Sequence, residues 1–370
     1  MTSPLMQKWA QTLVRFSAPV HPENTVLIMG GVDAEPLLRA IYAEVVTAGG
    51  HPVIVPTFTG IEASLLNRGS DEQLTWVTPV ERLWRETADV VIRVVAERNT
   101  RALSGVAPAR QAVYLGARRP LIDTFIAREI AGTLRWTITQ YPTNAFAQDA
   151  EMSTEAFEAF VASACMLDRD DPVAAWNELS RKQQTLVDWL TGKREIHLTG
   201  PGTNLTVDVT GRTWINADGH KNFPDGEVFT GPVETGTNGY VTFDMPAITQ
   251  GRAVEGIRLA FQHGKVVEAT ATKNADFLIQ QLDIDPGARI LGEFAFGANF
   301  GIQRFTGQLL FDEKIGGTVH MALGAGLPTT GNTNQSAIHW DMICDLRQGG
   351  RVTVDGEPFL LDGKFLLWEN

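Results

Sequence analysis

The stretch TVLIMGGVDAEPLLRAIYAEVVTAGGHPVIV, residues 25–55, decides the fold class of the N-terminal half. It begins with an apolar run of strand length at 25–29 and ends with a second such run at 52–55. Between them, apolar residues recur at helical spacing over 37–45, and two glycines follow. Continuous apolar strands separated by a helix predict a parallel sheet that helices cover on both faces.

Strand-like runs and helices continue to alternate beyond this stretch. Residues 88–96 and 134–140 are again apolar and of strand length, and amphipathic helical segments follow up to Leu190. The segment 191–193 (TGK) then interrupts the helical pattern. We therefore expect an α/β, Rossmann-like domain over residues 1–192.

The character of the sequence changes after this boundary. Short strand-like segments now dominate, and glycine-rich turns such as TGPGTN (199–204) and QHGK (262–265) separate them. One helix is expected at 274–282. The expected strands include 196–198, 205–209, 228–230, 241–245, 257–261 and 265–270. We therefore expect a β-rich α+β domain over residues 193–370, and it is here that the candidate catalytic residues lie.

Composition excludes several classes of protein. The formal net charge of -12 argues against nucleic-acid binding, which needs a basic surface. The only two cysteines, Cys165 and Cys344, argue against a disulfide framework and a cysteine zinc site. No signal-peptide core or membrane-spanning run is present, so we expect a cytoplasmic protein without membrane contact. The chain also lacks His-Glu-x-x-His and Gly-x-Ser-x-Gly, the motifs of thermolysin-type and serine hydrolases.

Two histidines and four carboxylates in the C-terminal half are candidate metal ligands. His339 and Asp341 are two residues apart, so a strand would point both side chains toward the same face. Glu293 interrupts the apolar run 290–296, where a carboxylate is costly unless it is paired or bound to a metal. The full set is Glu227, Glu293, Glu313, His320, His339 and Asp341.

Six ligands of mixed nitrogen and oxygen type suit two divalent ions that share a bridging carboxylate. Zn, Co, Mn and Mg all accept such ligands, and the residue types do not choose among them. Each residue also has an ordinary interpretation, as a packed histidine, a surface glutamate or a turn cap. From spacing alone, the metal site and these structural interpretations both stay open.

Four segments of the C-terminal half resemble the thermophilic aminopeptidase T / aminopeptidase S family of metallo-aminopeptidases. The segments are NFPDGEVFTGPVE (222–234), ILGEFAFGAN (290–299), LLFDEKIGGTVHMALG (309–324) and NQSAIHWDMICDL (334–346). The resemblance implies a two-domain, homodimeric, dinuclear hydrolase that removes N-terminal residues from short peptides or small amides, through a hydroxide bridging two metal ions.

The same resemblance assigns roles to the candidate residues. It implies that all six are metal ligands and that Glu293 bridges the ions, with Asp341 or Glu313 as alternative bridges. Glu227 and Glu313 are the candidate catalytic residues, because a carboxylate beside an activated water can transfer protons. One departure is that Leu327 stands where known members of the family carry a tyrosine.

Two alternatives to the aminopeptidase follow from the same residues. The chain resembles, more distantly, the 2,5-dihydroxypyridine dioxygenases, which would imply one Fe(II) on His339, Asp341 and one further ligand. Those enzymes carry a histidine where Glu293 lies and lack a counterpart of His320, which favours the hydrolase. A non-catalytic protein with a structural metal is the third possibility.

Overall fold

The computed structural model describes residues 3–368, which form two compact units. The first unit runs up to Trp176 and includes Gly219–Pro224. The second comprises Asn177–Asp218 and continues from Asp225. No helix within the described residues combines the length and apolar character that crossing a bilayer requires.

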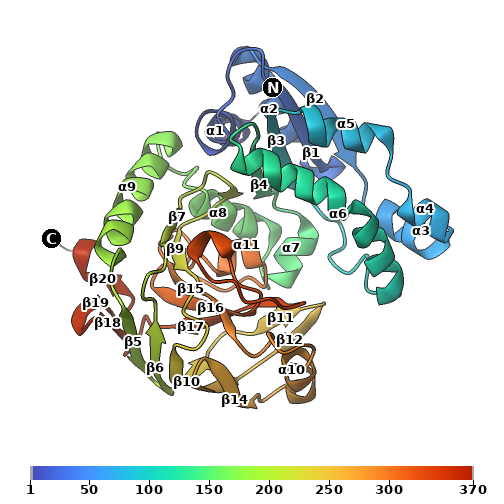
Figure 1. Cartoon of the computed structure of the whole chain (residues 1–370). Coiled ribbons are helices and arrows are strands. Elements are labelled where there is room, and N and C mark those ends of the chain that lie inside the picture. The colour runs from blue at the N-terminus through green and yellow to red at the C-terminus, as the bar shows by residue number, and fades with distance from the viewer. Residues whose placement is uncertain (1–2, 369–370) are drawn as a thin grey trace. The chain divides into compact units, whose positions relative to one another are not determined.

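A parallel sheet forms the centre of the first unit (Figure 1). Its strands, in spatial order, are β2 (His51–Thr57), β1 (Thr25–Gly31), β3 (Val90–Val95), β4 (Arg135–Gln140) and β8 (Asn222–Phe223). Every neighbouring pair is parallel. Val26, Ile28 and Ile92 are fully buried, as expected for strands covered on both faces. The predicted α/β fold of the N-terminal half is confirmed.

Helices connect these strands, and polar side chains define where several of them begin. Ser70 accepts a hydrogen bond from the backbone N–H of Gln73, whose side chain accepts one from the N–H of Ser70 in return. The α-helices up to residue 190 are α1 (Pro4–Thr12), α2 (Glu35–Thr47), α3 (Ile61–Arg68), α4 (Asp71–Thr75), α5 (Pro79–Thr87), α6 (Pro108–Ile130), α7 (Asn144–Asp149), α8 (Thr154–Ala164) and α9 (Pro172–Leu190). Shorter turns of helix are η1 (Leu13–Ser17) and η2 (Val32–Ala34).

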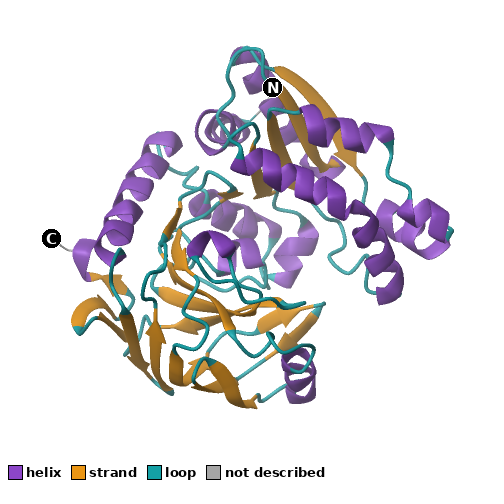
Figure 2. Cartoon of the chain, in the orientation of Figure 1, coloured by secondary structure: helices purple, strands orange, loops and turns teal. Residues whose placement is uncertain are grey.

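The second unit is built from antiparallel sheets, shown in orange in Figure 2. The eight-stranded sheet has the order β14 (Lys265–Thr270), β13 (Ile257–Gln262), β10 (Thr237–Phe243), β6 (Thr203–Asp208), β5 (Glu195–Gly200), β18 (Arg351–Val354), β19 (Glu357–Leu361) and β20 (Lys364–Phe365). The five-stranded sheet has the order β17 (His339–Asp345), β16 (Thr318–Gly324), β15 (Leu291–Gly297), β9 (Glu227–Thr230) and β7 (Ile215–Ala217). Smaller elements are β11 (Ala247–Thr249), β12 (Arg252–Val254), α10 (Ala275–Leu282), α11 (Leu309–Asp312), η3 (Pro328–Thr330) and η4 (Leu366–Trp368). The predicted β-rich character is confirmed.

One continuous apolar core joins these two sheets. On β15, Phe294 and Phe296 point into it, and on β16 Val319, Met321 and Leu323 do so. Side chains of β5, β6, β10 and β13 meet them from the eight-stranded sheet. Because side chains alternate along a strand, the residues between these core positions lie on the opposite face of the five-stranded sheet.

Candidate metal centre

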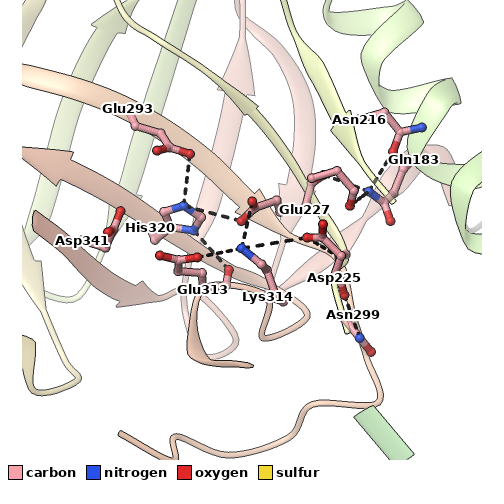
Figure 3. Close-up of polar contacts among 12 residues, drawn as sticks. Gln183, Asn216, Asp225, Glu227, Glu293, Asn299, Glu313, Lys314, His320 and Asp341 are labelled. Carbon is pink, nitrogen blue, oxygen red and sulfur yellow. Dashed lines mark hydrogen bonds and ion pairs between the residues drawn. The ribbon is translucent and has the colours of Figure 1, made fainter. Parts of the chain in front are cut away.

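That opposite face carries five of the six residues singled out in the sequence. Glu227 comes from β9, Glu293 from β15, His320 from β16, and His339 and Asp341 from β17. Each alternates with a core residue of its own strand, such as Phe294 beside Glu293 and Trp340 between His339 and Asp341. Figure 3 shows the side chains of Glu227, Glu293, His320 and Asp341 converging. Strand alternation and antiparallel pairing therefore gather residues that lie far apart in the sequence.

The pairing register places a small residue at the centre of this group. Glu293 pairs with Ala322 on β16, and Ala322 pairs with Asp341 on β17. The two carboxylates therefore flank a methyl group in one row across three strands. Ala322 is fully buried. A small side chain at this position leaves space above the sheet between the two carboxylates.

Three of these residues form a compact set of ligand atoms. The Nε2 atom of His339 lies 3.0 Å from Oε2 of Glu293 and 3.7 Å from Oδ1 of Asp341. One ligand atom from each of the three lies within 4.8 Å of the others, the kind of spacing that a single metal ion needs. The side chains of Glu293 and Asp341 are 9% and 5% exposed, whereas that of His339 is 33% exposed. The two carboxylates are therefore buried, whereas His339 is partly accessible to solvent.

Both histidines are oriented by backbone carbonyl groups. Nδ1 of His339 lies 2.8 Å from the carbonyl oxygen of Ala325, and Nδ1 of His320 lies 3.1 Å from that of Glu313. A histidine that donates its Nδ1–H to a carbonyl presents the lone pair of Nε2, the arrangement usual for metal-bound histidine. In both residues Nε2 faces the carboxylates, and His320 Nε2 lies 3.5 Å from Oε1 of Glu293.

The carboxylates favour positive charge at both Nε2 atoms. Burial alone would lower the histidine pKa values, but hydrogen bonding to Glu293 and the neighbouring carboxylates outweigh it. They raise the pKa of His320 to about 10 and that of His339 to about 9. Burial opposes the charge of Glu293 as well, yet hydrogen bonds from the same histidines lower its pKa to about 2. The field at these atoms favours a cation, whether a proton or a metal ion.

Within residues 3–368, two buried oxygen atoms of the group have no hydrogen-bond partner. They are Oε2 of Glu227 and Oδ1 of Asp341. Burial raises the pKa of Asp341 to about 7, because the charged form is poorly solvated there. An unsatisfied buried carboxylate oxygen is costly, and a bound cation removes that cost. The imidazole and carboxylate donors present therefore fit a divalent transition metal of the zinc, cobalt or manganese type.

The sixth predicted residue, Glu313, is linked to the other five by Lys314, which contacts both Glu313 and Glu227. Glu313 follows α11, and its Oε2 atom lies 2.6 Å from Nζ of Lys314. The same Nζ lies 2.9 Å from Oε1 of Glu227 and 3.9 Å from Oδ1 of Asp225. Figure 3 shows these contacts as dashed lines around the ammonium. The structure thus brings all six predicted residues to one place and adds two charged residues to them.

Sequence reasoning missed both Lys314 and Asp225. The side chain of Lys314 is only 1% exposed. Burial alone would lower its pKa, but Glu227, Glu313 and Asp225 outweigh it and raise that pKa well above the ordinary value. A signal was present in the segment Phe311-Asp312-Glu313-Lys314-Ile315, where buried apolar residues flank three charges. Charged residues between apolar ones can be buried in pairs, and here they are.

Comparison with known proteins supports the family that the motifs suggested. The sequence profile of the family described as thermophilic metalloprotease (M29) matches residues 2–365. The chain is 30% identical to aminopeptidase T of Thermus aquaticus, over 73% of this chain and 72% of that one. It is 27% identical to aminopeptidase 2 of Geobacillus stearothermophilus, over 97% of each chain.

Two solved structures share the fold. Wild-type AmpT from Thermus thermophilus has a TM-score of 0.83 at 23% identity, covering 98% of this chain and 99% of that one. The 2,5-dihydroxypyridine dioxygenase of Pseudomonas putida KT2440 has a lower TM-score of 0.64 at 14% identity, over 98% and 96%. The family profile and the aminopeptidases that the chain resembles in sequence confirm the prediction of a metallo-aminopeptidase over the dioxygenase alternative. With a profile match over almost its whole length, the chain belongs to the M29 family of thermophilic metalloproteases.

Proposed function

We propose that this enzyme removes N-terminal residues from short peptides, with its metal held at the group on the five-stranded sheet. The observation that carries this proposal is the set of Glu293, His339 and Asp341, whose ligand atoms lie within 4.8 Å of one another. A divalent ion bound there would polarise the scissile carbonyl and acidify a water molecule. The six residues predicted from the sequence remain our candidates for the metal-binding and catalytic set.

The carboxylates of the chain itself have two tasks in this proposal. Glu313 accepts the proton of the attacking water, because its side chain is 15% exposed whereas that of Glu227 is 6% exposed. The excess of carboxylates attracts the ammonium group of a free peptide N-terminus. That attraction favours substrates with an unblocked amino terminus and explains why the enzyme acts at chain ends.

We also propose the setting in which the enzyme acts. A cytoplasmic location agrees with two cysteines that are both free and buried. A homodimer follows from the family resemblance and is tested by the molar mass in solution, measured by light scattering. A mass equal to that of one chain across micromolar concentrations would contradict the dimer.

The proposed function is tested by hydrolysis of leucine p-nitroanilide and of short peptides. We expect release of the N-terminal residue, loss of activity with a chelator, and recovery on adding Zn²⁺, Co²⁺, Mn²⁺ or Mg²⁺. The N-acetylated substrate is the matched control and should not be cleaved. Chelator-resistant cleavage, or no cleavage with any of these ions, would refute the proposal.

Glu313→Gln should lower kcat by about 10²–10⁴-fold while the metal content stays unchanged. The amide keeps the shape of the side chain and its contact with Lys314 but cannot accept the proton. The measurement combines steady-state kinetics with elemental analysis of the purified variant. Glu268→Gln, at an exposed site on β14, is the control and should behave as wild type. Full activity in Glu313→Gln would exclude Glu313 as the proton acceptor.

Ala322→Leu should lower the metal affinity by at least about 10²-fold although no candidate ligand is changed. The larger side chain enters the space between Glu293 and Asp341, and overpacking a buried site forces neighbours out of position. Calorimetric titration with Zn²⁺ measures the affinity. Met321→Leu, a volume-conserving change on the core face of the same strand, is the control. Unchanged affinity in Ala322→Leu would place the ion elsewhere.

A further inference from the structure

Lys314 contacts two of the carboxylates, Glu227 and Glu313, that the two-ion arrangement predicted from the sequence would use as metal ligands. We propose that its ammonium group takes the place of a second ion, so that the centre holds one divalent ion on Glu293, His339 and Asp341. This proposal rests on the proposed metal-dependent function, and it differs from the two-ion arrangement predicted from the sequence in the number of ions.

The distances around Nζ support this substitution. Nζ lies 2.9 Å from Oε1 of Glu227 and 2.6 Å from Oε2 of Glu313. The ammonium group therefore already contacts the carboxylate oxygen atoms that would have to turn toward a second ion to bind it. The side chain of Lys314 is 1% exposed, so surrounding atoms hold it in place. An ion and the ammonium group cannot both occupy this position.

The charges lead to the same conclusion. A buried ammonium close to Glu227 and Glu313 already offsets negative charge that a second ion would otherwise offset. A divalent ion brought beside it would meet a like charge in a poorly screened environment. Lys314 therefore competes with a second ion for the same carboxylates.

The remaining donors do not make a second complete set. His320 Nε2 lies 3.6 Å from Oε2 of Glu227 and 3.5 Å from Oε1 of Glu293. Among residues 3–368, however, Glu293, His339 and Asp341 are the one group of three whose ligand atoms are all within 4.8 Å. His320 and Glu227 form a pair beside the ion. Lys314 contacts Oε1 of Glu227 and so positions this carboxylate, whose Oε2 atom faces His320.

The test is the number of ions per chain, measured by elemental analysis after loading with Zn²⁺ and gel filtration. We expect one ion in the wild type and one in Lys314→Arg, which keeps the charge. We expect two in Lys314→Met, because Glu227 and Glu313 are then free to bind metal. Glu227→Gln preserves the shape of the side chain and serves as a second test if Lys314→Met does not fold. It should still bind one ion.

The outcomes separate this inference from the proposed function. Two ions in the wild type, with chelator-sensitive peptide hydrolysis, would overturn the inference and leave the function standing. One ion in both the wild type and Lys314→Met, or loss of the ion in Glu227→Gln, would also overturn the inference. A wild type that binds no ion would overturn both.

Discussion

Glu293→Gln is expected to abolish metal binding and to lower kcat/KM on the order of 10³-fold or more. Glu293 is the residue that contacts both histidines, with Oε2 3.0 Å from His339 Nε2 and Oε1 3.5 Å from His320 Nε2. Removing one group that stabilises charge in a transition state lowers kcat by about 10²–10³-fold, and loss of the metal ion lowers the rate further. Kinetics with aminoacyl p-nitroanilides and calorimetric titration with Zn²⁺ measure the two effects.

The same variant should change the titration of the histidines in metal-free protein. Hydrogen bonding to Glu293 is the largest cause that raises the pKa of both His320 and His339. An amide has no charge, so both pKa values should fall toward the ordinary histidine range. NMR titration of the imidazole protons follows this shift. Glu255→Gln, at an exposed ion pair with Lys273, should change neither the titration nor the metal binding. Wild-type metal affinity in Glu293→Gln would remove Glu293 from the ligand set.

Lys314→Met is expected to lower the free energy of unfolding of the metal-free protein by about 3–5 kcal/mol. The change leaves Glu227 and Glu313 without the cation that compensates them, and breaking a buried ion pair from one side typically costs this much. Urea denaturation in the presence of a chelator measures the difference. Adding Zn²⁺ should recover part of the loss, because an ion that binds only the folded state stabilises it.

A matched control for this variant exists in the same unit. Lys273 pairs with Glu255 at 2.5 Å, but the two side chains are 58% and 42% exposed. Lys273→Met should therefore cost less than about 1 kcal/mol, as is usual for ion pairs in water. If Lys273→Met and Lys314→Met lowered the free energy of unfolding equally, burial would not strengthen the contribution of Lys314 to stability.

Sequence patterns predicted the fold class because local apolar spacing fixes local structure. The run at 25–29 lies within β1, and the periodic segment at 37–45 lies within α2. The same-face interpretation of His339 and Asp341 followed from strand alternation, and both lie on β17. Such features depend only on residues that are neighbours in the chain.

The interactions that were missed are non-local. The row from Glu293 through Ala322 to Asp341 depends on the register between three strands, and no local pattern encodes it. The burial of Lys314 depends on Asp225 and Glu227, which lie almost ninety residues earlier in the chain. Strand β8 likewise joins a sheet whose other strands end at Gln140. Tertiary contacts, rather than propensity, decide these positions.

The return of residues 219–224 to the first unit has a consequence for synthesis on the ribosome. Strand β8 pairs with β4, and fully buried Phe223 packs against Trp176 with ring centroids 5.1 Å apart. A nascent chain that has emerged only to Trp176 therefore exposes the edge of β4, with unpaired backbone groups that can pair with other chains. The sheet of the N-terminal unit is complete only after about fifty more residues, which at typical elongation rates is a delay of several seconds. A truncated fragment ending at Trp176 should for the same reason aggregate more readily than the full chain.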